Sequence, residues 1–107
     1  MRFCPWYPLA EAGAHAPPGA GVLQLRLRTG LLDYPSGKSA MVHYARADNV
    51  RACATALAAA HPNADLLCRH LEIEQDEHVD HAAFHAKVLE EFVRRFGSPP
   101  MMPDEPR

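Results

Sequence analysis

Three histidines occur at helical spacing in the last third of the chain. His78, His81 and His85 are separated by three and four residues, and such separations place side chains on one face of an α-helix. Imidazoles arranged in this way can bind Zn²⁺, Ni²⁺ or Cu²⁺. A zinc site usually takes a ligand from a second segment as well, for which His70 and Cys68 are the candidates. The same face continues into apolar residues, so the row can equally form the edge of a hydrophobic core.

Basic side chains are concentrated between residues 21 and 51, whereas the charged side chains of residues 72–91 are mostly acidic. The formal net charge is −2, so any contact with a nucleic acid has to come from a local patch. The candidate residues for this DNA-binding patch are Arg26, Arg28, Lys38, Arg46 and Arg51. Ordinary surface arginines explain the same pattern, and the acidic segment would instead suit a protein partner.

Several other classes of function lack a sequence signal. The chain has no Gly-x-Ser-x-Gly motif and no glycine-rich phosphate loop, which are typical of serine hydrolases and nucleotide-binding enzymes. Its three cysteines cannot all pair with one another, and none belongs to a Cys-x-x-Cys motif, so a cytoplasmic location is expected. No signal peptide is recognised, and no stretch approaches the roughly 20 apolar residues that span a bilayer. We therefore expect no membrane contact.

Hydrophobic periodicity predicts the elements that must position these residues. Leu23, Leu25 and Leu27 alternate with polar residues, which is typical of a strand with one buried face. Further strands are predicted at 38–45 and 66–74, with a loop over 29–37. A first helix follows the candidate N-cap Asp48 and ends at His61-Pro62, and a longer one runs over 77–96.

These elements predict an α/β (α+β) fold with a small three-stranded antiparallel-type sheet and the order β-β-α-β-α. The length of 107 residues suits one domain. We divide the chain into a proline-rich N-terminal arm (1–20), the domain itself (21–100) and a loose C-terminal tail (101–107). The arm is expected to be irregular, with one short helical turn.

Two short motifs within this pattern resemble a known family. Gly21-Val22-Leu23 is followed about twenty residues later by the run from His43 to Arg51, and this arrangement resembles the GIY-YIG nuclease superfamily. The order of the elements is similar, and Asn49-Val50-Arg51, Leu89-Glu90-Glu91 and Pro99-Pro100 stand where the family pattern has its counterparts. The resemblance implies metal-dependent cleavage of phosphodiesters, with Glu90 as the ligand of one divalent ion.

The departures from the family pattern fall on the catalytic positions. Leu23 stands in place of the first tyrosine, and Cys53 in place of an arginine. The second tripeptide reads His43-Tyr44-Ala45 instead of Tyr-x-Gly. A leucine cannot orient or deprotonate a water molecule. In an active variant the remaining candidates would be His43 as the general base, Tyr44 as its neighbour, and Arg46 or Arg51 at the phosphate, with Mg²⁺ or Mn²⁺ on Glu90.

Three functions therefore stand beside one another. The leading one is a GIY-YIG-like domain with a degenerate active site that serves as a nucleic-acid-binding or interaction module with little or no nuclease activity. The second is an active, divergent endonuclease, which requires His43, Arg51 and Glu90 to converge on one surface. The third is a histidine-dependent metal-binding protein built on His78, His81 and His85. Whether the chain is an enzyme stays open at this point.

Overall fold

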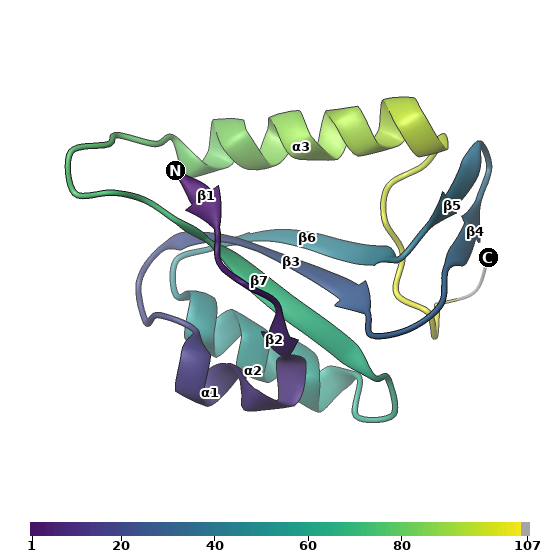
Figure 1. Ribbon diagram of the computed structural model, residues 1–107, viewed down its shortest axis with the longest axis horizontal. Coiled ribbons are helices and arrows are strands. Elements are labelled where there is room, and N and C mark those ends of the chain that lie inside the picture. The colour runs from purple at the N-terminus through teal and green to yellow at the C-terminus, as the bar shows by residue number, and fades with distance from the viewer. Residues whose placement is uncertain (106–107) are drawn as a thin grey trace.

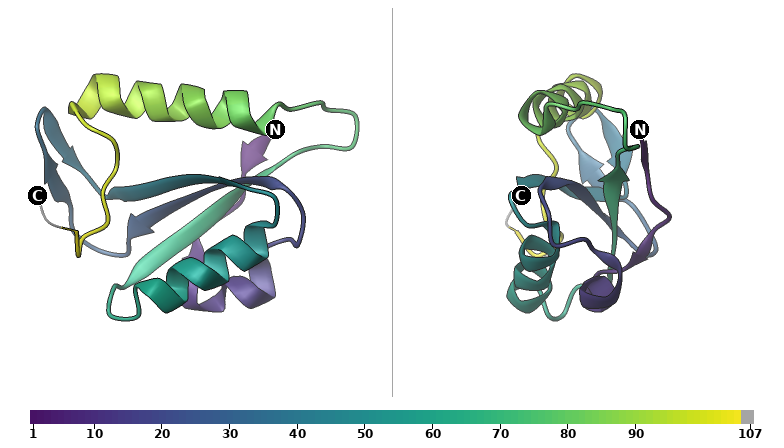
Figure 2. Two further views of the ribbon diagram at one scale, coloured as in Figure 1. Left: turned by 180° about the vertical axis from the view of Figure 1, so that it is seen from behind. Right: turned by 90° about the vertical axis from the view of Figure 1, so that its left-hand side faces the viewer.

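The structure, a computed structural model, describes residues 1–105 and is an α+β domain with three layers. An antiparallel sheet forms the middle layer. Helix α3 (His81–Phe96) covers one face of the sheet, while α1 (Ala12–His15) and α2 (Val50–Ala60) cover the other (Figure 1). The view from the back and the side view show the same layers (Figure 2). The predicted fold class is confirmed.

Three long strands form the centre of the sheet. Strand β3 (Gly21–Leu27) lies between β6 (Met41–Ala47) and β7 (Leu66–Glu72) and is antiparallel to both. Leu23 and Leu25 of β3 are completely buried, as the alternating pattern predicts. In the register of the sheet, Leu25 lies opposite His43 on β6 and opposite Cys68 on β7.

The N-terminal arm contributes two further strands that the sequence pattern does not predict. Strands β1 (Arg2–Phe3) and β2 (Tyr7–Pro8) both pair antiparallel with the outer edge of β7. A 3-10 turn, η1 (Leu9–Glu11), then leads into α1. Each strand has only two residues, too few for a visible period, and the pairing joins segments about 65 residues apart. Local patterning cannot detect such a contact.

The predicted loop over 29–37 and the predicted strand over 38–45 are wrong in detail. A separate hairpin of β4 (Leu32–Tyr34) and β5 (Gly37–Ser39) occupies this region, and β6 starts only at Met41. The Tyr34 hydroxyl donates a hydrogen bond to the Met41 carbonyl oxygen at 2.7 Å. This bond ties the hairpin to the start of β6.

Both long helices start at a side-chain cap. The Asn49 side chain accepts a hydrogen bond from the Ala52 amide at 3.0 Å, so Asn49 caps α2 in place of the predicted Asp48. Asp80 accepts from the Ala83 amide at 3.0 Å, and α3 therefore begins four residues later than the predicted 77.

The core lies between the sheet and α2. Val50 and Ala54 of α2 pack with the buried leucines of β3 and with Cys68. On the other face, Phe92 is the buried residue of α3 among those described. Its ring meets the rings of Tyr34 and Tyr44 edge to face. The two faces of the sheet are therefore covered very differently.

The described part of the C-terminal tail packs against the domain, although the sequence pattern predicts a loose tail over 101–107. Met102 is buried, and the Met101 amide donates to the Tyr34 hydroxyl at 3.1 Å. Asp104 contacts His61 at 2.8 Å. Residues 106–107 lie outside the described part of the chain. No described helix has the length and apolar character needed to cross a membrane.

Candidate functional site

The structure does not bring the four candidate nuclease residues together. His43 and Tyr44 are neighbours on β6, and consecutive side chains of a strand point to opposite faces of the sheet. Tyr44 contacts α3 through Phe92, at 5.6 Å between ring centroids. Arg51 lies on α2, where its Nε donates to the Ala16 carbonyl oxygen at 2.8 Å. Glu90 is exposed on α3, beyond the other face of the sheet.

Burial also limits the acid-base chemistry of the β6 pair. It lowers the pKa of His43, so this imidazole favours its neutral form. It raises the pKa of Tyr44, which stays a phenol at neutral pH. His43 lies on the face of the sheet toward α2, which carries Arg51. Tyr44 lies on the face toward α3, which carries Glu90. The four candidates are therefore divided between the two faces, and no shared phosphate position follows from this geometry.

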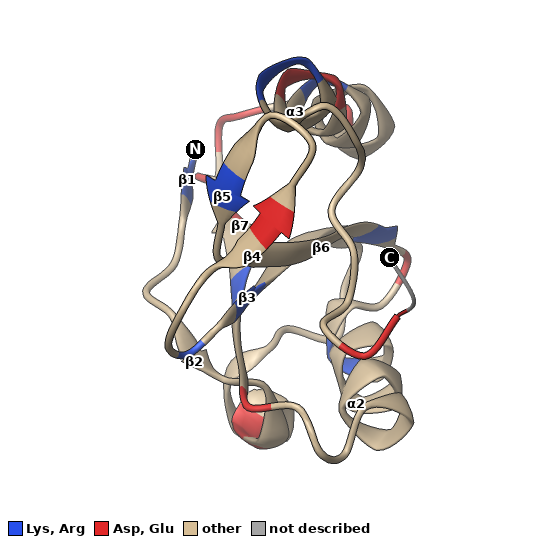
Figure 3. Ribbon diagram, turned by 90° about the vertical axis from the view of Figure 1, so that its right-hand side faces the viewer, with Lys and Arg blue, Asp and Glu red and all other residues tan. Residues whose placement is uncertain are grey.

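Most residues of the predicted basic patch have a carboxylate or carbonyl partner. The contacts are Arg28 with Asp65 at 2.9 Å, Lys38 with Asp33 at 3.6 Å, Arg46 with Asp48 at 3.7 Å and Arg51 with the Ala16 carbonyl. The basic and acidic segments of the β4–β5 hairpin lie side by side in Figure 3. Exposed pairs of this kind partly cancel the positive field that a polyanion would meet. Arg26 also donates from Nε to a carbonyl oxygen, that of Leu27 at 3.1 Å, and its guanidinium lies over the ring of Trp6.

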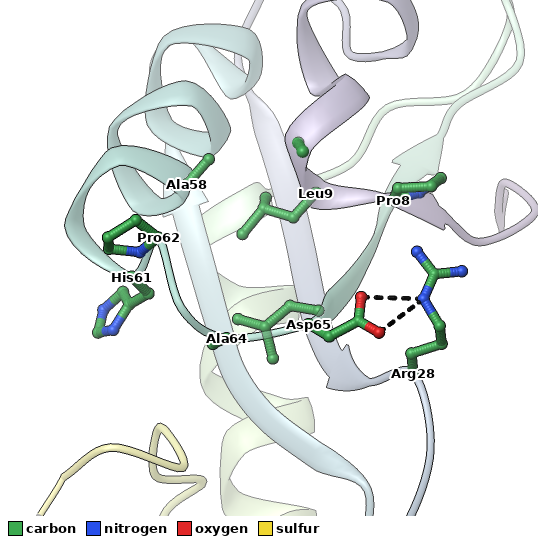
Figure 4. A pocket seen from close by; sticks show the side chains of 10 residues that line it. Pro8, Leu9, Arg28, Ala58, His61, Pro62, Ala64 and Asp65 are labelled. Atoms are coloured by element: carbon green, nitrogen blue, oxygen red, sulfur yellow. Dashed lines mark hydrogen bonds and ion pairs between the residues drawn. The ribbon is translucent and has the colours of Figure 1, made fainter.

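The pair of Arg28 and Asp65 borders a small cavity between the N-terminal arm and the end of α2 (Figure 4). The cavity has a volume of about 110 Å³, and most of its lining is apolar. Arg28 donates from Nε to both Asp65 oxygens at 2.9 and 3.0 Å. The two charged groups of this cavity therefore bind each other.

The three histidines of the predicted row have different surroundings. His78 is exposed in the segment before α3, and His81 begins the helix. The Nε2 atom of His81 is buried and has no hydrogen-bond partner among the described residues. His85 donates from Nε2 to the Tyr44 carbonyl oxygen at 3.1 Å. The row is therefore partly engaged in attaching α3 to β6.

A different set of side chains has the proximity that a metal site needs. Within residues 1–105, the only group of three or more histidine, cysteine or acidic donors that lie within 4.8 Å of one another is Cys4, His70 and Glu72. The Cys4 Sγ atom is 3.4 Å from His70 Nδ1. His70 is one of the two residues proposed from sequence as a ligand from a second segment, but its neighbours here are Cys4 and Glu72. We call these three residues the Cys–His–Glu cluster.

The Cys–His–Glu cluster lines a pocket of about 320 Å³ beside the N-terminal arm. The other lining residues are Pro5, Trp6, Tyr7 and His15. The Tyr7 hydroxyl is 3.0 Å from His70 Nδ1 and accepts from the Cys68 thiol at 3.5 Å. The cluster therefore continues into a buried polar chain.

Burial disfavours the charged forms of Cys4, Tyr7, Cys68 and His70. It raises the pKa values of Cys4 and Tyr7, and it raises that of Cys68 to about 11. It also lowers the pKa of His70. A protonated thiol is a poor nucleophile, so the arrangement does not support thiolate catalysis without a further group that removes the proton.

The opposite face of the sheet carries a second cluster, which we call the arginine–aromatic strip: Phe3, Trp6, Gln24, Arg26 and Arg69. The guanidinium carbon of Arg69 is 4.4 Å from the ring centroids of both Phe3 and Trp6. Its Nε donates to the Gln24 side-chain oxygen at 2.8 Å. Arg26 lies 5.4 Å from the Trp6 centroid. Among the described residues, neither arginine has a carboxylate within ion-pair distance.

A groove under α3 extends this strip. It has a volume of about 240 Å³. Its lining residues are Gln24, Tyr44, Val88, Glu91, Phe92, Arg95 and Phe96. Gln24 is buried, lines this groove and accepts the hydrogen bond from Arg69, so it lies between the strip and the groove.

Sequence reasoning missed the aromatic partners because they belong to the N-terminal arm, which reaches β7 only in the folded chain. A partial signal exists on β7, where Arg69 alternates with His70 and thus occupies the other face. Comparisons of the chain with protein-family models, with curated proteins and with solved structures each found no match.

Proposed function

We propose that the protein is a binding module for single-stranded nucleic acid with a degenerate GIY-YIG-like fold, and that the arginine–aromatic strip is its binding surface. The observation that carries the proposal is the arrangement of Arg69. This guanidinium lies against two aromatic rings and has no carboxylate partner among the described residues. The cluster thus differs from Arg28, Lys38 and Arg46, which are paired.

The hydrogen bond to Gln24 fixes the direction of the guanidinium. Because Nε is occupied, the two terminal amino groups of Arg69 are the donors left for a ligand. Guanidinium groups bind phosphate oxygens with parallel hydrogen bonds, and aromatic contacts at their faces leave this edge accessible. Arg26 adds a second positive charge beside the same Trp6 ring. The strip can therefore hold a phosphate in a defined orientation.

Aromatic side chains favour a single strand over a duplex. Trp6 and Phe3 are half-buried, with Arg69 over both rings and Arg26 over the Trp6 ring. Unpaired bases stack on such rings, and each stacking contact contributes about 1–3 kcal/mol. Bases within a duplex are already stacked and cannot use these rings. The module should therefore prefer single-stranded over double-stranded ligands of equal length.

The absence of cleavage is part of the proposal. His43, Arg51 and Glu90 lie on separate elements and on both sides of the sheet. A phosphodiester held at the strip would not meet a metal-bound glutamate and a general base together. We expect no cleavage of branched, single-stranded or duplex DNA with Mg²⁺ or Mn²⁺. Cleavage that disappears in His43→Ala or Glu90→Ala would contradict this part.

Binding is tested with a fluorescent single-stranded oligonucleotide and the full chain at several salt concentrations. Arg69→Gln and Arg26→Gln should each weaken binding several-fold and reduce the slope of log K against log salt by about one unit. Arg28→Gln is the matched control, because Arg28 already has Asp65 as its partner. Its affinity should stay close to that of the parent chain. Equal effects of Arg69→Gln and Arg28→Gln, or no binding even at low salt, would overturn the proposal.

A further inference from the structure

The Cys–His–Glu cluster has the spacing of a metal site that has three protein ligands. The distance between Cys4 Sγ and His70 Nδ1 is 3.4 Å. Tetrahedral zinc with ordinary Zn–S and Zn–N bonds would separate these two atoms by about 3.6 Å. The Glu72 carboxylate completes a set in which all donor atoms lie within 4.8 Å of one another. The three groups can therefore surround one ion when His70 Nδ1 exchanges its contact with the Tyr7 hydroxyl for the metal.

The backbone holds two of the three ligands in place. The Cys4 amide donates to the His70 carbonyl oxygen at 2.9 Å, and the His70 amide donates to Cys4 Sγ at 3.3 Å. An amide that donates to sulfur partly offsets the burial that raises the pKa of Cys4, and a metal ion would displace the remaining proton to bind the thiolate. His70 and Glu72 are two residues apart on β7 and so face the same side of the sheet. Three ligands from two chain segments are thus preorganised.

The charges of the three ligands and the elements of their donor atoms indicate which ion would bind. A thiolate, a carboxylate and a neutral imidazole together carry two negative charges, which a divalent cation neutralises. Sulfur and nitrogen ligands favour zinc over magnesium or calcium, which prefer oxygen. The same ligand types would accept Co²⁺ as a spectroscopic substitute.

The fourth position faces an open space. The cluster lines the pocket of about 320 Å³, and the Tyr7 hydroxyl lies 3.0 Å from His70 Nδ1. Structural zinc sites have four protein ligands, whereas sites with three protein ligands keep one position for water or another small ligand. The Tyr7 hydroxyl is close enough to hydrogen-bond a group in that position.

We propose that Cys4, His70 and Glu72 bind one Zn²⁺ ion whose fourth coordination position opens into the pocket beside Tyr7. The ion would also tie the N-terminal arm to β7, since Cys4 lies between β1 and β2. The three ligands belong neither to the histidine row of α3 nor to the arginine–aromatic strip. Trp6, the single tryptophan of the chain, lines the pocket beside the ligands and also belongs to the strip.

The test titrates the chelator-treated full chain with Co²⁺ and then with Zn²⁺. We expect one equivalent of Co²⁺ to bind and to give a thiolate-to-cobalt charge-transfer band, which Zn²⁺ abolishes. The fluorescence of Trp6 should change with the same stoichiometry, and the melting temperature should rise because the metal binds the folded state. A chain that shows no thiolate band and no metal-dependent rise in melting temperature would overturn the proposal.

Variants separate this site from other sources of metal binding. Glu72→Gln changes an exposed residue, so the variant should fold normally. It should weaken metal binding by more than about tenfold, because changes to residues that only support the ligands already cost this much affinity. Cys4→Ser should remove the charge-transfer band, while Cys53→Ser, the matched cysteine control, should keep it. Binding that survives Glu72→Gln and Cys4→Ser but is lost in His78→Ala with His81→Ala would assign the metal to the histidine row instead and would overturn the proposal.

Discussion

His43 shows how the sheet sets the chemistry of a single residue. Its side chain shares a face with Leu25, and burial lowers its pKa. Glu105 acts in the opposite direction, whereas the charges of His61 and His85 add to the lowering. Desolvation outweighs the single carboxylate, so the folded protein favours the neutral imidazole.

This lowering predicts a loss of stability in acid. The unfolded chain has a histidine pKa of about 6.5 and takes up a proton first as the pH falls. The free energy of unfolding should therefore decrease from about pH 8 to about pH 5. In His43→Gln this decrease should be smaller, as measured by urea unfolding at both pH values. His15→Gln is the control for a side chain at the surface. An unchanged pH dependence in His43→Gln would contradict the assignment.

At the scale of single elements, both ends of α3 are closed by specific hydrogen bonds. Its N-terminus is capped by Asp80, and its C-terminus ends at Gly97, whose φ is 86°. The Gly97 amide donates to the Val93 carbonyl oxygen at 2.7 Å. The Ser36 amide donates to the Phe96 carbonyl oxygen at 3.0 Å, which joins the helix end to the β4–β5 hairpin.

Gly97→Ala should destabilise the protein by about 1–2 kcal/mol from the left-handed backbone alone. The new Cβ atom would also lie 2.9 Å from Ser36 Oγ and 3.0 Å from Pro35 Cβ. Gly30→Ala is the matched control, since Gly30 has a φ of 84° but no atom within 4 Å of an added Cβ. Chemical denaturation should show a larger loss for Gly97→Ala than for Gly30→Ala. Equal losses would mean that the contact with the hairpin contributes nothing.

The caps of the two long helices allow a second comparison. Replacing a capping Asn or Asp by Ala costs about 1 kcal/mol. Because Val50 and Ala54 anchor α2 in the core, we expect Asn49→Ala to leave the helix content of the folded state unchanged while lowering stability. Asp80→Ala should additionally reduce the helical signal before global unfolding, since α3 has little burial to hold its first turn. Identical circular dichroism curves for both variants would argue against this difference.

On the scale of the whole molecule, the two faces of the sheet carry different kinds of side chain. The face toward α2 contains the apolar core with Leu23, Leu25 and Val50. The face toward α3 carries Gln24, Arg69 and Tyr44, which are polar or ionisable and are covered by a single helix (Figure 1). A folded domain tolerates such a polar face when the groups bond to one another, as Gln24 and Arg69 do.

This asymmetry predicts different local stabilities. Amides of α3 should exchange with solvent faster than those of β3, because local opening of α3 exposes one group of aromatic contacts around Phe92, whereas β3 can open only with the core. Hydrogen exchange measured by mass spectrometry on peptides from the two segments would compare them directly. Equal protection of α3 and β3 would show that the helix unfolds only together with the whole domain.

The local pattern of the chain determined the three long strands and the two long helices. Alternating leucines marked β3, and the run into Gly97 marked the end of α3, since periodicity and capping depend on residues close in sequence. Of the candidate functional residues, the sequence pattern predicts Arg26 as a nucleic-acid contact and His70 as a metal ligand. It predicts that Arg26 acts with the other basic residues and that His70 acts with the histidine row. The Asn49 cap differed from the expected Asp48 by one residue.

Only the tertiary structure decided which of these residues meet. Cys4 reaches His70, and Trp6 reaches Arg69, because the N-terminal arm pairs with the edge of β7. The same sheet places His43 and Glu90 on opposite sides. Alternation along a strand predicts which side chains share a face, but it does not say which strands pair or which residues then lie opposite one another.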